Sequence, residues 1–252
     1  MSDLLDHPPS IFAITLAAQW LAAYAGDLLA MRARGESTAE HEDLSTILTA
    51  TLTLLGLIIG FSFSMAISRY DQRKNYEEAE AKAIRTEYVR ADLLSAPDAA
   101  RVRELLKNYL DVRIRFYETR DEQQLGHIDA HTTQLQTQLW SAVEGAADKQ
   151  QRYPSLVVSG VNDVLNSQED TQAAWAFRLP VAAWFFMFVA AIFSALLSGY
   201  SRRRKGITVF AIVPLAVSIS LFLIADIESP RRGLIRVVPN NLITLSQSLQ
   251  AQ

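Results

Sequence analysis

Long apolar stretches interrupt the chain at four places. Three contain no charged residue: Leu44–Ser68, Leu179–Ser201 and Gly206–Ala225. The fourth, Ile11–Met31, is apolar apart from Gln19 and Asp27. About 20 apolar residues form a helix that crosses the hydrocarbon core of a bilayer. The pattern therefore predicts four spanning helices, over Ile11–Met31, Leu44–Ser68, Leu179–Tyr200 and Ile207–Ala225, and it excludes a simple soluble enzyme.

The first stretch lies where a cleaved secretory signal would lie. A signal peptide combines a basic leading segment with a short apolar region. Here Met1–Ser10 contains no Lys or Arg, and the apolar stretch is longer than usual. Pro8 and Pro9 are typical of a helix start. We therefore expect a retained spanning helix.

Charge is concentrated between the second and third stretches. Of the 51 charged residues, 33 lie in Arg69–Arg178. Apolar residues recur there every three or four positions, which is typical of amphipathic helices. Four helices are predicted, over Arg69–Asp92, Pro97–Glu118, His131–Ala147 and Pro154–Phe177, with Ser95 as the N-cap of the second. The positions expected to face the core are Ala81, Ile84, Tyr88, Ala91 and Leu94; Val102, Leu105, Leu106, Tyr109, Leu110 and Ile114; Leu135, Leu139 and Val143; and Leu156, Val161, Val164 and Leu165.

The predicted fold is thus all-α, with four transmembrane helices (2 + 2) and a water-facing antiparallel helical bundle inserted between the second and third spans. The corresponding domains are an N-terminal transmembrane hairpin (1–68), the helical domain (69–178), a C-terminal transmembrane hairpin (179–225) and an amphipathic tail (226–252). In the tail, Leu242, Leu245 and Leu249 recur at helical spacing.

The second span carries a stripe of small and hydroxyl side chains on one helical face. The stripe consists of Thr49, Thr53, Gly56, Gly60 and Ser64. Gly56 and Gly60 form a GxxxG pattern, which allows close helix packing inside lipid. Narrow pores also use small and hydroxyl side chains. The stripe is therefore a candidate helix-packing face and a candidate pore lining.

Composition and motifs provide few candidates for chemistry. The chain has no cysteine, which excludes disulfides and thiolate sites. Its net charge of −3 gives no support for nucleic-acid binding. His127 and His131 have the i,i+4 spacing of two metal ligands, with Asp129 between them, but in this polar, Gln-rich stretch we expect them to be solvated. We predict no enzyme, no metal and no cofactor.

The remaining charged candidates are interpreted as solvated groups. Glutamates and cations alternate along Arg69–Asp92, and we expect exposed ion pairs within the helix; a charged vestibule above a pore is the alternative. The residues concerned are Glu77, Glu78, Glu80 and Glu87 with Arg73, Lys74, Lys82 and Arg85. Asp27 and Asp226 lie near span ends, where we expect solvation at the interface.

Orientation follows from the basic residues near the spans. The two short loops carry Arg32, Arg34, Arg202, Arg203, Arg204 and Lys205, whereas the N-terminal segment carries no Lys or Arg. The positive-inside rule then places the short loops in the cytoplasm and the helical domain outside it. The cations Arg69, Arg73, Lys74, Arg231, Arg232 and Arg236 oppose this orientation.

Two segments carry a resemblance to a known family. Leu54–Leu94, with the sequence LLGLIIGFSFSMAISRYDQRKNYEEAEAKAIRTEYVRADLL followed by Pro97 and Asp98, resembles the bestrophin-like membrane-domain family of unknown function. The tail, DIESPRRGLIRVVPNNL, is similar at Asp226, Pro230, Gly233 and Pro239. The resemblance extends over the layout of nearly the whole chain.

The resemblance implies an oligomeric pore, because bestrophins are oligomeric anion channels with a helical domain between paired spans. It also implies a cytosolic helical domain, contrary to the loop cations. The chain lacks the consecutive aromatic residues of a bestrophin neck, and Phe61 and Phe63 are the nearest candidates. Chloride conduction is therefore not implied.

Two functions follow from the sequence. The first is a homo-oligomeric ion channel in the cell inner (plasma) membrane, with the lipid bilayer, a second copy of the chain and an ion as partners. The second is a non-conducting scaffold or sensor whose helical domain binds a partner. An enzyme has no supporting constellation of residues.

Overall fold

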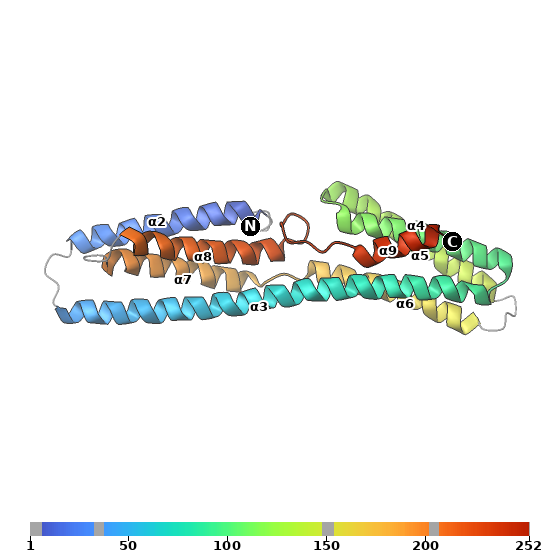
Figure 1. Cartoon of the computed structure of the whole chain (residues 1–252), viewed down its shortest axis with the longest axis horizontal. Helices are drawn as coiled ribbons and strands as arrows, with labels where there is room; N and C mark the ends of the chain where they lie inside the picture. The colour runs from blue at the N-terminus through green and yellow to red at the C-terminus, as the bar shows by residue number, and fades with distance from the viewer. Residues whose placement is uncertain (1–6, 33–37, 148–153, 202–206, 252) are drawn as a thin grey trace. The chain divides into compact units, whose positions relative to one another are not determined.

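The computed structural model describes residues 7–32, 38–147, 154–201 and 207–251, which form helices and no strands (Figure 1). The helices are α2 (Pro8–Arg32), α3 (Thr38–Arg90), η1 (Ala91–Leu93), α4 (Ala96–Glu118), α5 (Glu122–Ala147), α6 (Pro154–Ala176), α7 (Val181–Tyr200), α8 (Ile207–Glu228) and α9 (Asn240–Gln250). The prediction of an all-α chain is confirmed.

Among the described residues, four helical stretches are long and apolar enough to cross a membrane, as the hydropathy pattern predicts. They lie in Pro8–Arg32, Asp43–Leu93, Ser155–Tyr200 and Ala211–Glu228. Helix α3 has 53 residues, which at 1.5 Å per residue is about 80 Å, far more than a hydrocarbon core of about 30 Å. Eleven charged residues lie in its second part, Arg69–Arg90. The apolar first part, Leu44–Ser68, is therefore the part of α3 whose composition fits a bilayer, and the charged second part does not.

The chain divides into two compact units. Unit 1 comprises Met1–Ser68 and Arg178–Ile235, and unit 2 comprises Arg69–Phe177 and Arg236–Gln252. Helix α3 therefore contributes its first part to unit 1 and its second part to unit 2. The end of the tail, including α9, belongs to unit 2. The cations Arg34 and Arg202–Lys205 of the short loops lie outside the described residues.

Unit 1 is held together where α2 crosses α7. A Cβ atom on Gly26 would lie 2.1 Å from the carbonyl oxygen of Leu196, and one on Gly199 would lie 1.9 Å from that of Ala23. Only glycine allows two backbones to approach this closely. Inside the same unit, the Gln19 amide donates a hydrogen bond of 3.1 Å to the Ser218 hydroxyl, which joins α2 to α8.

The carboxylate of Asp226 stabilises the end of α8. The expectation that Asp226 is solvated at the interface was therefore wrong. Asp226 is buried, and its oxygens accept hydrogen bonds from the backbone N–H groups of Leu234 (2.7 Å) and Ile235 (2.8 Å). Gly233 packs against the same turn, where a Cβ would lie 2.2 Å from the carbonyl oxygen of Asp226. Asp226 therefore closes the turn that follows α8. Asp27 on α2 is only half-buried.

Unit 2 has a continuous apolar core of residues from α3, α4, α5, α6 and α9. Its predicted positions on α5 are all buried, and so are Leu242, Leu245 and Leu249 of the tail. Ser95 is the N-cap of α4, as predicted. Two expectations were wrong: α5 begins at Glu122, nine residues before His131, and Leu156 is exposed because it lies at the start of α6.

Candidate functional site

The stripe on the apolar part of α3 is not covered by any of the described residues. Thr49, Thr53, Gly56, Gly60 and Ser64 are all exposed. A Cβ on either glycine would meet no atom of the described residues within 4 Å. The close helix contact of unit 1 is made by other glycines, so this GxxxG pattern makes no such contact with the part of the chain that the structure describes.

The opposite side of the same segment is buried. Leu48, Leu55, Ser62 and Ala66 recur every four or seven residues and are nearly inaccessible. At 100° per residue the mean direction of these positions lies about 135° away from that of the stripe. The segment therefore has one face packed within unit 1 and another face free for lipid, a second copy of the chain or a water-filled conduit. The aromatic candidates differ in exposure: Phe61 is exposed and Phe63 is half-buried.

The two threonine hydroxyls on the stripe are already hydrogen-bonded. Thr49 Oγ1 donates to the carbonyl of Ser45 at 2.8 Å, and Thr53 Oγ1 donates to that of Thr49 at 2.8 Å. Bonds of this kind satisfy a hydroxyl in lipid. They leave the oxygen lone pairs directed away from the helix backbone, where they can accept further hydrogen bonds or contact a cation.

In unit 2, α3 buries charged side chains, which contradicts the expectation that they form exposed ion pairs. Arg73, Glu77, Glu80 and Glu87 are each at most 1% exposed. Together with Ile84 they recur at spacings of three, four and seven, so they share one helix face. Among the described residues of this segment, Glu78 and Lys82 form an exposed ion pair of the expected kind, with oxygen and nitrogen 2.5 Å apart, and Lys82 lowers the pKa of Glu78.

Glu80 forms the centre of a buried network with α4 and α6. Arg113, itself fully buried, forms a salt bridge to Glu80 through Nε, and its Nη2 lies 3.4 Å from the second carboxylate oxygen. The Tyr117 hydroxyl donates to that oxygen at 3.2 Å, and the Thr171 hydroxyl lies 3.4 Å from it. Burial lowers the pKa of Arg113, but the Glu80 carboxylate together with the neighbouring Tyr109 and Tyr117 outweighs burial, so the pKa is raised.

Arg73 and Glu77 each bind the end of another helix. Arg73 donates to the carbonyl of Ala174 (3.2 Å), in the last turn of α6, and to that of Phe177 (3.3 Å), the residue after the helix ends. Glu77 accepts hydrogen bonds from the backbone N–H groups of Asn241 and Leu242, each 2.9 Å long, and from the Asn241 side chain at 2.6 Å. A carboxylate at a helix N-terminus and a cation at a C-terminus both match the helix dipole. These two residues therefore fasten α6 and α9 to α3.

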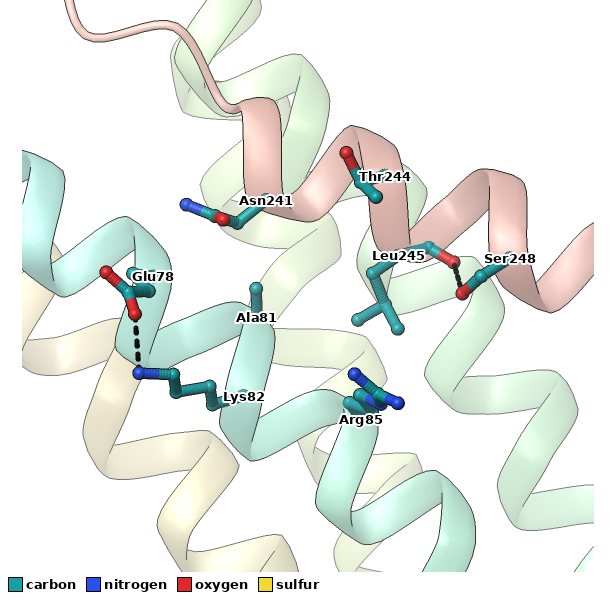
Figure 2. Close-up of a pocket in the computed structure, with 8 residues that line it drawn as sticks. All are labelled: Glu78, Ala81, Lys82, Arg85, Asn241, Thr244, Leu245 and Ser248. Atoms are coloured by element: carbon teal, nitrogen blue, oxygen red, sulfur yellow. Dashed lines mark hydrogen bonds and ion pairs between the residues drawn. The ribbon is translucent and has the colours of Figure 1, made fainter.

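A shallow cavity of about 290 Å³ lies between α3 and α9 (Figure 2). The residues around it are Glu78, Ala81, Lys82 and Arg85 from α3 and Asn241, Thr244, Leu245 and Ser248 from α9. Its six polar lining residues are all exposed. Exposed polar groups keep their water and hold a ligand weakly, so we interpret this cavity as a hydrated seam beside the Glu77 contact.

The histidine pair does not form part of a metal-binding cluster among the described residues. His127 and His131 are exposed on α5, and Asp129 between them accepts a hydrogen bond of 3.1 Å from Gln172 on α6. Within the described ranges, no three His, Cys, Asp or Glu side chains are grouped so that they could hold a metal ion.

Sequence reasoning missed the buried charges on α3, although a signal was present. Arg73, Glu77, Glu80 and Glu87 occupy the same helical face as Ile84, which was assigned to the core. Charges in the register of a core position indicate buried partners on neighbouring helices. Those partners, such as Arg113, lie far away in the sequence and cannot be paired with α3 by spacing.

Comparisons with known proteins agree with this architecture. The family model described as bestrophin-like domain matches residues 13–242. A single-substitution variant of a bacterial bestrophin homologue from Klebsiella pneumoniae is similar in structure, with a TM-score of 0.65 at 14% identity over 97% of this chain and 98% of that one. A structure described as a membrane protein, also a variant, has a TM-score of 0.63 at 14% identity over 95% and 97%. None of the curated protein sequences matches the chain significantly.

Proposed function

The chain belongs to the bestrophin-like domain family, and from this premise we propose that it assembles with copies of itself into an ion channel whose conduit is lined by the stripe on α3. Family membership supports a membrane ion channel at the level of the family, and the low-identity structural likeness supports the shared fold. The lining of the conduit by the stripe, the assembly with further copies of the chain and the conducted ion go beyond family membership and are parts of our proposal.

The observation that carries the proposal is the exposure of the stripe. Thr49, Thr53 and Gly56 lie uncovered on a helix whose other side is packed. A helix face that contacts only lipid needs only large apolar side chains, because small and hydroxyl side chains gain no favourable contact with lipid. Small and hydroxyl side chains suit a wall that ions pass or a helix of a second copy that packs closely.

Ion flux into liposomes tests conduction directly. The purified protein is reconstituted with a salt gradient, and flux is compared for wild type, Thr53→Trp and Leu21→Trp. Leu21 is 69% exposed on α2 and provides a matched control. We expect Thr53→Trp to reduce flux at least about tenfold, since a large side chain blocks a narrow pore, and Leu21→Trp to leave it unchanged. Equal flux from wild-type and empty liposomes would overturn the proposal.

Assembly is tested at the glycines. Gly60→Leu adds a side chain on the uncovered face, whereas Gly199→Leu adds one inside the α2–α7 crossing. If copies pack through the stripe, Gly60→Leu changes the oligomer seen by native mass spectrometry and leaves each chain folded. Gly199→Leu should instead destabilise the single chain. An unchanged oligomer and unchanged thermal stability in Gly60→Leu would contradict a packing role for the stripe.

The alternative function is a non-conducting scaffold or sensor. The size of unit 2 and its buried polar network support this alternative, because a simple pore needs neither of them. A chain that assembles normally but passes no ion in liposomes would favour this alternative.

For orientation, we propose that unit 2 lies on the extracytoplasmic side of the plasma membrane, as the cations of the short loops indicate. The natural chain has no cysteine, so single cysteines report accessibility. Ser159→Cys lies at an exposed position of α6 and should react with an impermeant maleimide on intact cells. Ser201→Cys should react only after permeabilisation. The reverse pattern would place unit 2 in the cytosol.

A further inference from the structure

Glu87 is a buried carboxyl group in unit 2. Its side chain is fully inaccessible, and neither carboxyl oxygen has a hydrogen-bond partner among the described residues. Burying an ionised carboxylate without partners is costly, so such a group keeps its proton. This distinguishes Glu87 from Glu77 and Glu80 on the same face, which both accept several hydrogen bonds.

The carboxyl group occupies a place that a glycine on α6 leaves free. A Cβ on Gly160 would lie 1.7 Å from Glu87 Oε2 and 2.9 Å from its Cδ. Any larger residue at position 160 would displace the carboxyl group. Helices α3 and α6 therefore meet at a contact that consists of a carboxyl group against bare backbone.

Arg90 of α3 and Asp163 of α6 lie beside this contact. Arg90, one turn further along α3, has its Nη1 3.6 Å from the Asp163 carboxylate on α6 and donates to the carbonyl of Leu156 at 3.4 Å. The same Nη1 atom would lie 2.8 Å from a Cβ on Gly160, so it is already close to the carboxyl site. On η1, the carboxylate of Asp92 forms a salt bridge with Arg103 of α4.

We propose that Glu87 is a proton-controlled latch between α3 and α6. While it is protonated, the carboxyl group fits the space at Gly160, and Arg90 stays with Asp163 and the first turns of α6. When it ionises, the carboxylate attracts Arg90, its neighbour at i+3. Arg90 then leaves Asp163 and the Leu156 carbonyl, and the beginning of α6 loosens.

The latch is placed to respond near neutral pH. Burial, with a smaller contribution from Asp163, raises the pKa of Glu87 to about 8, against the opposing effect of Arg90. Because the folded-state pKa is raised above 4.5, the stabilisation is fully present below about pH 4.5 and is lost as the pH rises towards 8. This inference does not depend on whether the chain conducts ions.

Infrared spectroscopy of the full-length protein in detergent tests the protonation directly. The wild type should show the band of a protonated carboxylic acid at pH 6.5 and lose it above about pH 8. Glu87→Gln should lack that component, whereas Glu78→Gln, at an exposed and ion-paired position, should keep it. Loss of the band below pH 6 in the wild type, or its persistence in Glu87→Gln, would overturn the proposal.

Hydrogen exchange tests the mechanical consequence. Corrected for intrinsic chemistry, protection at the start of α6 (residues 155–163) should fall by up to about tenfold per pH unit between pH 6 and 8 and then level off. Glu87→Gln should remove this dependence, and Asp163→Asn should move the midpoint to lower pH because it removes a negative neighbour. A residue with a purely packing role would give identical pH profiles in wild type and Glu87→Gln, which would refute the latch.

Discussion

Replacing the Glu80–Arg113 pair should reveal how strongly unit 2 depends on a buried charge. Both side chains are completely inaccessible, and the carboxylate also accepts a hydrogen bond from Tyr117. Removing one partner leaves the other charge buried and uncompensated, which typically costs about 3–5 kcal/mol. Replacing both by apolar residues of similar volume removes two desolvation penalties together and is often nearly neutral.

The test is a double-mutant cycle with Glu80→Leu, Arg113→Met and the double variant. About 1 kcal/mol shifts the Tm of a chain of this size by roughly 2–4 °C. Each single variant should therefore lose roughly 6–20 °C in a thermal scan of the full-length protein in detergent, and the double variant should recover most of that loss. A double variant at least as unstable as the sum of the singles would refute the reasoning, because the network would then stabilise through its hydrogen bonds and not through mutual neutralisation.

Three further predictions concern single contacts. Glu77→Ala should free the N-terminus of α9, and because hydrogen bonds to a charged group contribute about 1.5–3 kcal/mol, hydrogen exchange in α9 should accelerate roughly 10- to 100-fold while α5 stays protected. Asp226→Ala should lower the Tm and raise proteolytic cleavage after α8, because two backbone N–H groups lose their acceptor; unaltered cleavage would contradict its role in the turn. Gln19→Leu should change the Tm by less than about 4 °C, since a hydrogen bond between spans contributes only about 0.6 kcal/mol on average, and a larger loss would indicate a buried network around Ser218.

Several features of the fold could be predicted from the chain alone. The long apolar runs, three of them without any charge, predict the four apolar spans because a charged side chain is costly in lipid regardless of tertiary context. The segment Arg69–Asp92 contains no proline or glycine, and α3 runs without a break from the second apolar stretch through this segment up to Arg90. Leu135, Leu139 and Val143 follow the period of a helix, and that period alone identifies a core-facing side.

The tertiary structure decided which polar residues are buried. The local sequence does not distinguish the four glutamates of this segment, because each lies on the same helix with cations nearby. They are Glu77, Glu78, Glu80 and Glu87. Only Glu78 forms the expected exposed pair. The other three are buried because α4, α6 and α9 supply an arginine, a glycine and a helix N-terminus at positions far away in the sequence.

The same division applies to the glycines. The sequence by itself identifies Gly56 and Gly60 as a close-packing pattern, since the spacing places both on one face of a spanning helix. Tertiary packing assigns the close crossing within the chain to Gly26 and Gly199, which lie on different helices and have no spacing in common. A local period reveals which face a residue occupies, because helix geometry is local. Which partner meets that face depends on how distant segments are brought together, and that is decided only when the chain folds.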